Sequence, residues 1–227
     1  MKMQFHAYGD SALLINFDQK IDPEINLAVV ALKDAIEKFT IPGVTFCIPA
    51  YCSLTVGYNP SVLHYDELCE QINALTSINM DDKKLQPGRT LKIPVCYEVP
   101  YALDFPDLIQ QTGVSREEII KIHTTTPFRV YMLGFLPGFA YMGRLPETLF
   151  CSRKKTPRLR VPAQSVGLAG YQTGIYPSEA PGGWQIIGRT PLKIFDGEKE
   201  NPFLFQPGDQ VVFEAISKEE FERMERQ

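Results

Sequence analysis

A short basic segment in the second half of the chain has the residue types that bind oxyanions. Five of the eight residues in 153–160 (RKKTPRLR) are Lys or Arg, with no Asp or Glu among them, although the whole chain carries a formal charge of −4. Guanidinium groups offer paired donors to planar oxyanions such as carboxylate, phosphate or carbamate. The segment therefore predicts an anion site with Arg158 as a candidate catalytic cation. A solvated loop is the structural alternative, and it accounts for most such runs.

The next segment, 161–177 (VPAQSVGLAGYQTGIYP), combines three glycines with hydrogen-bonding side chains. Glycine adopts positive φ readily and lets backbone N–H groups converge on an anion. In that interpretation Ser165, Gln172, Thr173 and Tyr176 supply hydrogen bonds that orient a bound small molecule. The alternative is a set of tight corners in a β structure, and the residues alone favour neither. No phosphate-binding G-x-x-x-x-G-K-[ST] motif occurs in the chain.

His123 is the only histidine in the second half of the chain. Proton transfer near neutral pH needs a group that titrates there, which makes His123 a candidate general acid or base. It also lies at the end of a predicted helix, where a histidine can simply interact with the last carbonyls and the helix dipole. The pattern alone leaves both roles open.

Two aromatic segments punctuated by glycine are candidate partner surfaces. Residues 134–143 contain Phe135 and Phe139 around a Pro-Gly turn, and residues 181–190 contain the only tryptophan, Trp184, beside two glycines. Aromatic residues are enriched at interface hot spots, so these three are predicted interface anchors. Core packing is the default alternative, because aromatic side chains bury large surfaces.

The cysteine and histidine pattern predicts neither disulfides nor a metal site. The five cysteines are an odd number and lack C-x-x-C spacing, and no H-E-x-x-H motif occurs. Free thiols in a reducing cytosol are the expectation. We predict no tightly bound metal or cofactor of the chain's own, while Mg²⁺ carried in with a nucleotide stays open.

Composition and charge exclude two further classes. The acidic balance, with a pI of about 5.5, argues against a duplex nucleic-acid binder, which needs a broad basic face. The N-terminal residues lack the apolar region of a signal peptide, and the uncharged stretch 39–65 is broken by prolines, so no membrane-spanning helix is expected. The prediction is a cytoplasmic globular protein.

Hydrophobic periodicity predicts an α+β unit in the first part of the chain. Asp22-Pro23 is a helix start, and apolar residues recur at three- and four-residue steps from Ile25 to Phe39. Strands are expected at 13–17, 44–48 and 53–58, and a second helix at 65–75. The order of elements expected for this part of the chain is β-β-α-β-β-α. This order suggests a small sheet with helices on one side.

The residue pattern changes after a polar stretch, 79–90, which we interpret as a linker. A strand at 91–95 is followed by short helices at 104–111 and from the capping box Ser115-x-x-Glu118 to about His123. Eleven of the sixteen glycines then lie between Gly134 and Gly208, which favours a closed or sandwiched β structure. The predicted domains are 1–88 and 89–227.

Five segments taken together resemble one family, described variously as the 5-oxoprolinase B subunit, allophanate hydrolase subunit 1 or sporulation kinase A inhibitor. Its pattern is F-x-P-G-F-x-Y-[ML]-G-x-L-P, P-R-x-x-V-P-A-G-S-V-G, Q-T-G-[IV]-Y-P, P-G-G-W-x-[IL]-I-G-x-T and P-G-D-x-V-x-F. The matching segments here are 135–146, 157–167, 172–177, 181–190 and 207–213. Where the family usually has Gly between Ala and Ser, this chain has Gln164, a position where Gly would serve positive φ or close ligand approach.

The resemblance implies a small α/β domain followed by a cyclophilin-like β barrel, without implying prolyl isomerase activity. It also implies a subunit, inactive alone, of an ATP-dependent 5-oxoprolinase that converts 5-oxo-L-proline to L-glutamate. The implied partners are a sister carboxyltransferase-like C-type subunit and an A-type subunit, with ATP and Mg²⁺ used in the assembled complex. A histidine in the matching place supports a functional role for His123.

The same family contains members of a different class, described as inhibitors that bind a sporulation sensor histidine kinase. The sequence separates the two functions poorly. Neighbouring genes for the sister subunits would favour the enzyme, and a neighbouring sporulation kinase system would favour the inhibitor.

Overall fold

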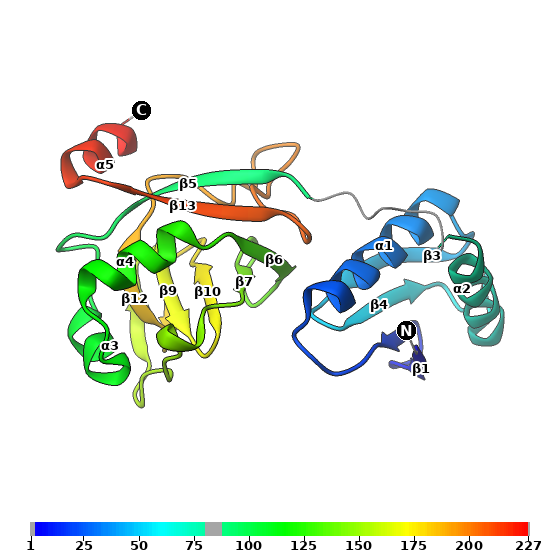
Figure 1. Ribbon diagram of the computed structural model, residues 1–227. Coiled ribbons are helices and arrows are strands. Elements are labelled where there is room, and N and C mark those ends of the chain that lie inside the picture. The colour runs from blue at the N-terminus through cyan, green and yellow to red at the C-terminus, as the bar shows by residue number, and fades with distance from the viewer. Residues whose placement is uncertain (1–2, 80–87, 227) are drawn as a thin grey trace. The chain divides into compact units, whose positions relative to one another are not determined.

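The computed structural model describes residues 3–79 and 88–226, and the chain divides into two compact units, Met1–Pro87 and Gly88–Gln227. The first unit is a sheet covered by helices, and the second is a barrel with short helices beside it (Figure 1). Each unit has its own hydrophobic core. We call them the sheet unit and the barrel unit.

The sheet unit contains one antiparallel sheet of order β1-β2-β4-β3. Its elements are β1 (Gln4–Ala7), β2 (Ala12–Asn16), α1 (Pro23–Phe39), β3 (Val44–Pro49), β4 (Ser53–Tyr58) and α2 (Tyr65–Asn79). In Figure 1, α1 lies across β3 and β4. The predicted order of elements is therefore confirmed.

Local chemistry accounts for the start and the burial of α1. The Asp22 carboxylate accepts from the backbone N–H groups of Glu24 at 2.8 Å and Ile25 at 3.3 Å, and Pro23 occupies the first turn. The apolar stripe, including Val29 and Ile36, is buried against sheet residues of the same core. Burial of that stripe holds the helix on the sheet.

The barrel unit closes seven strands in the order β10-β7-β6-β13-β5-β12-β9. These strands are β5 (Thr90–Cys96), β6 (Phe128–Leu133), β7 (Ala140–Gly143), β9 (Ser165–Ala169), β10 (Gln172–Ile175), β12 (Gln185–Arg189) and β13 (Gln210–Ile216). The last strand, β13, pairs in parallel with the first, β5, so the two ends of the barrel segment close it. Closure leaves no free sheet edge among these strands.

The remaining elements of the barrel unit lie outside the barrel wall. They are α3 (Phe105–Thr112), α4 (Arg116–Thr125), η1 (Glu147–Leu149), β8 (Arg158–Val161), β11 (Ala180–Gly182) and α5 (Lys218–Glu225). The strands β8 and β11 form a separate two-stranded sheet, while α3 contacts β12 and α4 contacts β13.

The α+β class with a terminal barrel is confirmed, while the linker is shorter than expected and one helix was not predicted. Asn79 ends α2 and Thr90 begins β5, so the expected linker is shorter at both ends; its residues 80–87 lie outside the described part of the chain. The helix α5 was not predicted. Ser217 accepts from the Glu220 backbone N–H at 3.2 Å, so a capping sequence was present to predict α5.

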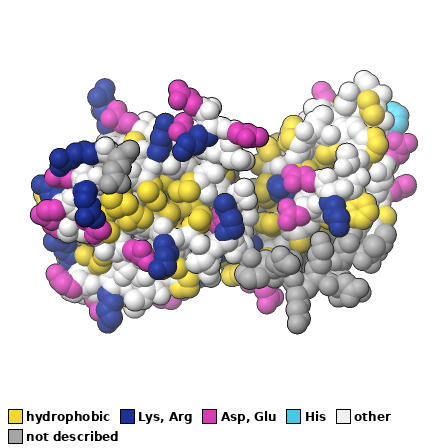
Figure 2. All heavy atoms as spheres, turned by 90° about the horizontal axis from the view of Figure 1, so that it is seen from above, with side chains coloured by type: hydrophobic (Ala, Val, Ile, Leu, Met, Phe, Trp, Pro, Cys, Tyr) yellow, Lys and Arg dark blue, Asp and Glu magenta, His cyan; other side chains and the backbone are white. Residues whose placement is uncertain are grey.

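Charged side chains of both signs are interspersed on the face of the barrel unit that Figure 2 displays. Hydrophobic side chains gather in the middle of that face, with Lys, Arg, Asp and Glu spread around them. This view contains no broad basic face of the kind that duplex nucleic acid requires.

Gln164 adopts the left-handed backbone conformation that its position demands, with φ of 61°. Its N–H donates to the Tyr176 carbonyl at 2.6 Å, and its carbonyl accepts from the Thr190 N–H at 3.0 Å. These two bonds tie the corner before β9 to neighbouring segments, so the backbone cannot relax without breaking them. Gln164 therefore holds the positive φ for which the family usually has glycine, at the conformational penalty that an L-residue incurs there.

We expect Gln164→Gly to leave barrel stability within about 1 kcal/mol of the parent chain, because relief of strain offsets the entropy of glycine. Gln164→Ile should destabilise it by about 1–2 kcal/mol, since a β-branched residue tolerates positive φ poorly. Urea unfolding followed by the fluorescence of Trp184, the only tryptophan, reports on the barrel unit alone. An Ile variant as stable as the parent would contradict the assignment of strain.

Candidate functional site

His123, predicted as a proton-transfer group, lies fully buried inside the barrel unit. Its Nδ1 lies 2.7 Å from the Tyr97 hydroxyl, and its Nε2 lies 2.9 Å from Thr173 Oγ1. The imidazole also stacks on Phe213 with ring centroids 4.3 Å apart. Both ring nitrogens are thus already engaged by protein groups.

Burial lowers the pKa of His123 from 6.5 to about 3. The imidazole is therefore neutral at physiological pH, with one ring nitrogen donating and the other accepting. A neutral ring without solvent access suits a polar tie between α4, Tyr97 and β10 better than proton exchange with a substrate. The geometry favours a structural role for His123 through its bonds to Tyr97 and Thr173, and not through the helix carbonyls and dipole that its sequence position suggested. Its catalytic role stays a prediction.

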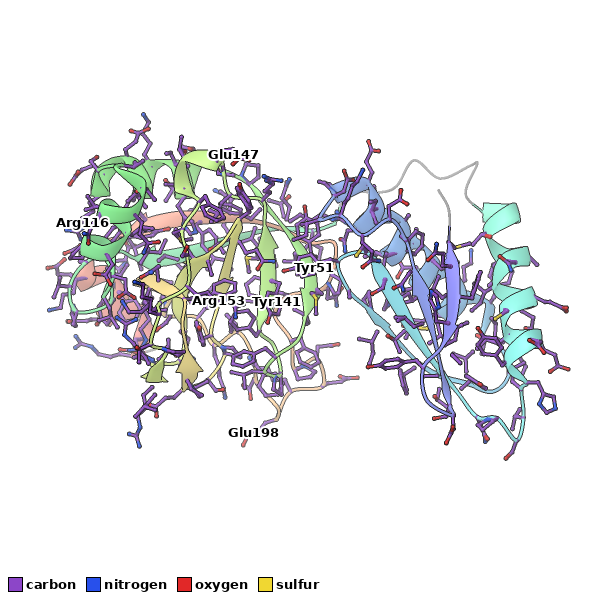
Figure 3. The ribbon with its side chains drawn as sticks, turned by 90° about the horizontal axis from the view of Figure 1, so that it is seen from below. Tyr51, Arg116, Tyr141, Glu147, Arg153 and Glu198 are labelled. Atoms are coloured by element: carbon purple, nitrogen blue, oxygen red, sulfur yellow. The ribbon has the colours of Figure 1, made fainter. Side chains whose placement is uncertain are left out.

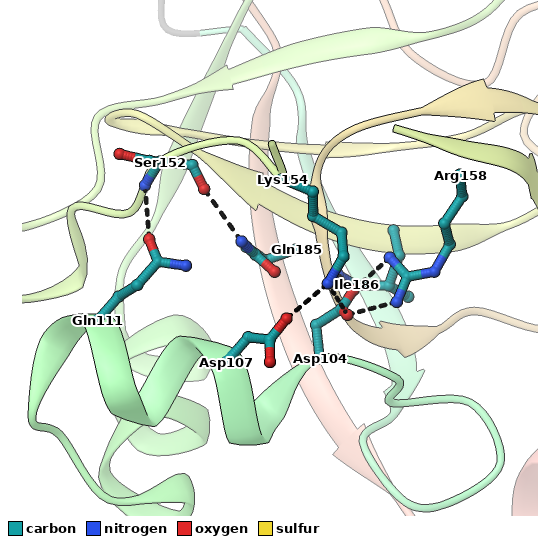
Figure 4. Close-up of polar contacts among 8 residues, drawn as sticks. All are labelled: Asp104, Asp107, Gln111, Ser152, Lys154, Arg158, Gln185 and Ile186. Carbon is teal, nitrogen blue, oxygen red and sulfur yellow. Dashed lines mark hydrogen bonds and ion pairs between the residues drawn. The ribbon is translucent and has the colours of Figure 1, made fainter. Parts of the chain in front are cut away.

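The basic segment 153–160 divides into inward- and outward-facing side chains. Lys154 and Arg158 turn inward onto Asp104, which is only 2 % exposed (Figure 4). Arg153 and Arg160, in contrast, are exposed. A single segment therefore supplies both structural cations and surface cations.

Asp104 accepts hydrogen bonds from three directions. Arg158 Nη1 donates to Oδ2 at 2.8 Å and Arg158 Nη2 donates to Oδ1, while Lys154 Nζ donates to Oδ1 at 2.8 Å. The Ile186 backbone N–H adds a bond of 2.6 Å to Oδ2. Burial alone would raise the pKa of Asp104, but these bonds outweigh it and hold that pKa below its usual value.

These contacts bear on Arg158 as the predicted catalytic cation. Its bidentate partner is a buried carboxylate, so much of its charge is compensated within the barrel unit. The guanidinium is still about one quarter exposed. The geometry thus supports a structural role for Arg158, and a catalytic role stays a prediction.

The four predicted substrate-binding residues do not converge on one open site. Thr173 is fully buried and bonds to His123, and Ser165 and Tyr176 are almost fully buried. Gln172 is partly exposed at the start of β10. The three buried residues belong to the corners and wall of the barrel, the alternative that the sequence left open; substrate contact by any of the four stays a prediction.

The three predicted interface anchors fall into two groups. Trp184 and Phe139 are 4 % and 1 % exposed and pack edge-to-face with centroids 5.4 Å apart in a second core cluster. Phe135 is 60 % exposed and sits at φ of 68° in a tight turn closed by Leu136 N–H to Gly134 O at 2.9 Å. In the isolated chain, core packing accounts for the first two, and Phe135 alone of the three is available to a partner.

One accessible pair of side chains, the Arg153 cation and the Tyr141 phenol, lies beside this aromatic core. Tyr141 packs on Phe139 at 4.8 Å and on Trp184 at 6.0 Å between ring centroids, and it remains half-buried. Figure 3 shows Arg153 beside Tyr141. Burial raises the pKa of Tyr141, and the positive charge of Arg153 opposes that rise. We call Tyr141 and Arg153, with Tyr176 behind them, the tyrosine–arginine site.

Tyr176 shares the electrostatics of this site. Burial raises the pKa of its phenol, while a hydrogen bond with the Trp184 backbone and the charges of Arg153 and Arg158 oppose that change. Phenol and guanidinium groups are both hydrogen-bond donors at neutral pH. The tyrosine–arginine site can therefore bind an oxyanion or stabilise negative charge developing on oxygen.

Other features constrain the chemistry further. Within residues 3–79 and 88–226, no three His, Cys, Asp or Glu side chains gather where they could hold a metal ion. Over the same residues, no helix is long and apolar enough to cross a membrane. The cysteines among them are free thiols, and burial raises the pKa of Cys151 to about 12, so that thiol is unreactive.

Sequence reasoning missed three residues that organise the barrel unit. Asp104 appeared only as a helix start, and Tyr97 carried no local signal. Tyr141 was part of an aromatic segment interpreted as a candidate partner surface, with core packing as the alternative. Two sequence signals indicated that buried polar partners exist: the single histidine of the second domain and the basic segment without acidic residues. Neither signal identifies Tyr97, Asp104 or Tyr141.

We expect the stability of the barrel unit to depend on pH through His123. Below pH 6.5 the unfolded chain binds a proton at His123 that the folded barrel does not. The free energy of unfolding should therefore decrease as the pH is lowered below 6.5, by about 1.4 kcal/mol per pH unit. Urea unfolding by Trp184 fluorescence between pH 6.5 and 5 should show this slope, and His123→Gln should reduce it. An equal dependence of stability on pH in the parent chain and in His123→Gln would contradict the assignment of this slope to His123.

The Asp104 network yields a matched pair of variants. Asp104→Ala should destabilise the barrel by about 3 kcal/mol, because it removes the bidentate partner of Arg158 and leaves Lys154 only the exposed Asp107. Asp107, 55 % exposed, also accepts from Lys154, yet Asp107→Ala should cost under about 1 kcal/mol, since water screens that pair. Denaturant unfolding of both variants measures the difference, and similar losses would contradict a dominant role for Asp104.

Comparison with known proteins identifies the family. A family model of the carboxyltransferase domain, subdomain C and D, matches residues 3–205. The chain is 38 % identical over 231 residues to the 5-oxoprolinase B subunit of Bacillus subtilis (strain 168), covering 97 % of this chain and 96 % of that protein. It is 40 % identical over 212 residues to the 5-oxoprolinase B subunit of Escherichia coli O157:H7, covering 92 % and 94 %.

Solved structures agree with this match. The crystal structure of TTHA0988 superposes with a TM-score of 0.80 at 34 % identity, over 91 % of this chain and 40 % of that longer chain. A conserved protein from Pyrococcus horikoshii, PH0987, matches at 43 % identity with a TM-score of 0.57, over 96 % of this chain and all of that one. The resemblance inferred from the five motifs is confirmed: the chain belongs to the family of carboxyltransferase domains, subdomain C and D, that includes the 5-oxoprolinase B subunits.

Proposed function

We propose that this chain is the B subunit of a 5-oxoprolinase, an enzyme that opens the lactam of 5-oxo-L-proline to L-glutamate with ATP hydrolysis. The observation that carries the proposal is the near-full-length match to two 5-oxoprolinase B subunits, at 38 % and 40 % identity. A match over both units supports a shared role of the whole chain, since neither unit is missing from those relatives.

The reaction needs donors aimed at an amide oxygen, because hydrolysis of a lactam develops negative charge there. The tyrosine–arginine site offers such donors on the accessible surface of the barrel unit. Arg153 is an exposed cation, and Tyr141 is a half-buried phenol on a rigid aromatic floor. We assign to Arg153 and Tyr141 the binding of a substrate or intermediate oxyanion.

A rigid support suits this role. The segment that carries Arg153 continues directly into Lys154, which is anchored on Asp104 at 2.8 Å. The Lys154 backbone N–H also donates to the Gly183 carbonyl at 2.7 Å, next to Trp184. The cation and its aromatic floor are thus tied to each other through neighbouring residues, which reduces the reorganisation needed on binding.

ATP and its Mg²⁺ do not fit a site on this chain alone. The described residues contain no cluster of three potential metal ligands, and the sequence has no P-loop motif. We therefore propose that the nucleotide binds to the partner subunits or at an interface shared with them. The subunit designation of its relatives supports a multi-subunit enzyme.

The partners proposed are a sister carboxyltransferase-like C-type subunit and an A-type subunit. The exposed Phe135 at the surface of the barrel unit is a proposed contact for one of them. Isolated, the chain should release no glutamate from 5-oxo-L-proline. The three co-purified subunits should release it only when ATP and Mg²⁺ are present.

The test is ATP-dependent glutamate release by the co-purified complex, with and without Arg153→Ala in this chain. We expect Arg153→Ala to lower kcat by on the order of 100-fold, because one donor to the developing charge is lost. Lys155→Ala, the removal of a neighbouring exposed cation, is the matched control and should retain near-parental turnover.

Two outcomes bear on different parts of the proposal. A verified complex that releases no glutamate refutes the 5-oxoprolinase assignment, and binding of this chain to a sensor histidine kinase would then support the inhibitor function. Full activity in the Arg153→Ala complex, with assembly intact, refutes only the role of the tyrosine–arginine site.

A further inference from the structure

A separate groove of about 500 Å³ lies on the barrel unit, between the segment before α3 and the start of α4. Its lining is apolar except for Arg116, and includes Val99, Leu103, Phe105 and Ile109. Val99, Leu103 and Ile109 are 73 %, 42 % and 37 % exposed. Its volume falls within the range of small-molecule sites, which combine apolar walls with a few placed polar groups.

Arg116 is held in one orientation within this lining. Its Nη2 donates to the Tyr97 carbonyl at 2.7 Å, and its guanidinium lies over the Phe105 ring, 5.2 Å from the centroid. Figure 3 places it at the end of the barrel unit where α3 and α4 meet, away from Tyr141 and Arg153. A guanidinium fixed in this way loses little conformational entropy when it binds a planar anion.

The charge of Arg116 lacks a counterpart in the described part of the chain. Over residues 3–79 and 88–226, no carboxylate lies within ion-pair distance of it; Glu118 of the same helix turn pairs with Lys121 instead. The Arg116 Nε is also a buried donor without a hydrogen-bond partner among these residues. Native proteins seldom leave such a donor unsatisfied, so each instance calls for an explanation.

We propose that this groove binds a small monocarboxylate with a compact apolar body. The apolar part would cover the exposed side chains of Val99, Leu103 and Ile109, and the carboxylate would face Arg116. The low polarity of the lining strengthens the ion pair relative to water. Charge complementarity and a preorganised guanidinium favour this ligand class over a neutral apolar one. The proposal is independent of the 5-oxoprolinase assignment.

The test uses benzoate as probe and benzamide as its uncharged match, with the full chain labelled at Ile, Leu and Val methyl groups for NMR. Benzoate should shift the methyl signals of Val99, Leu103 and Ile109 saturably. The affinity for benzamide should be lower by at least about ten-fold, because benzamide lacks the charge that Arg116 recognises. The methyl signals of Leu159, 89 % exposed elsewhere on the unit, should not respond.

Variants isolate the role of the guanidinium. Arg116→Gln should weaken benzoate binding to the level of benzamide, while Arg223→Gln, on α5, removes an exposed charge and should leave binding unchanged. If Arg116→Gln fails to fold, the comparison of benzoate with benzamide on the parent chain decides alone. Equal shifts by both probes, or equal benzoate binding after Arg116→Gln, overturns the proposal. The proposal would also be overturned if the methyl signals of the groove did not shift with benzoate but changed on addition of the sister C-type subunit. That outcome would identify the groove as a protein interface.

Discussion

A carboxylate withdrawn from water must find its compensation inside the protein, and Asp104 finds it in three separate parts of the barrel unit. Arg158 comes from β8, Lys154 from the preceding loop, and the Ile186 N–H from the barrel strand β12. The Asp104 N–H in turn donates to the Ile186 carbonyl at 2.9 Å. One side chain at the start of α3 thus fastens an outer sheet, a basic loop and the barrel wall to one another. Removal of the carboxylate or of Arg158 would leave a charge poorly compensated at a site that water reaches poorly.

This arrangement separates structural polar groups from those available for chemistry. His123 and Asp104 use their hydrogen-bonding capacity within the barrel unit, where burial keeps the histidine neutral and bonding keeps the carboxylate ionised. Arg153, in the same basic segment as Lys154, remains exposed beside Tyr141. The buried polar groups are thus compensated within the barrel unit, while this neighbouring cation stays exposed to solvent.

Much of the fold was predictable because local signals and periodicity agree with the tertiary structure. Asp22-Pro23 begins α1, Gly113 ends α3 with φ of 70°, and Ser115 caps α4, as their sequence patterns indicate. The glycine density after Gly134 favoured a closed or sandwiched β structure, and the barrel is the closed one of these two. The chemistry was less predictable. An acid-free basic segment was interpreted as an anion site, yet its anion lies about fifty residues earlier in the same chain, as the carboxylate of Asp104.

The sequence by itself determined the family, the α+β class and most helix and strand positions, because each depends on local periodicity, capping residues and ordered motifs. Only the tertiary structure decided which polar residues face solvent. His123 meets Tyr97 and Thr173, and Arg158 meets Asp104, across 26 to 54 positions of the chain. Such contacts arise when helices, loops and strands distant in sequence pack together in the barrel unit, and no local pattern encodes them. Burial and pairing then set the charge state of each group, and so separate the residues that hold the barrel together from those free to act on a substrate.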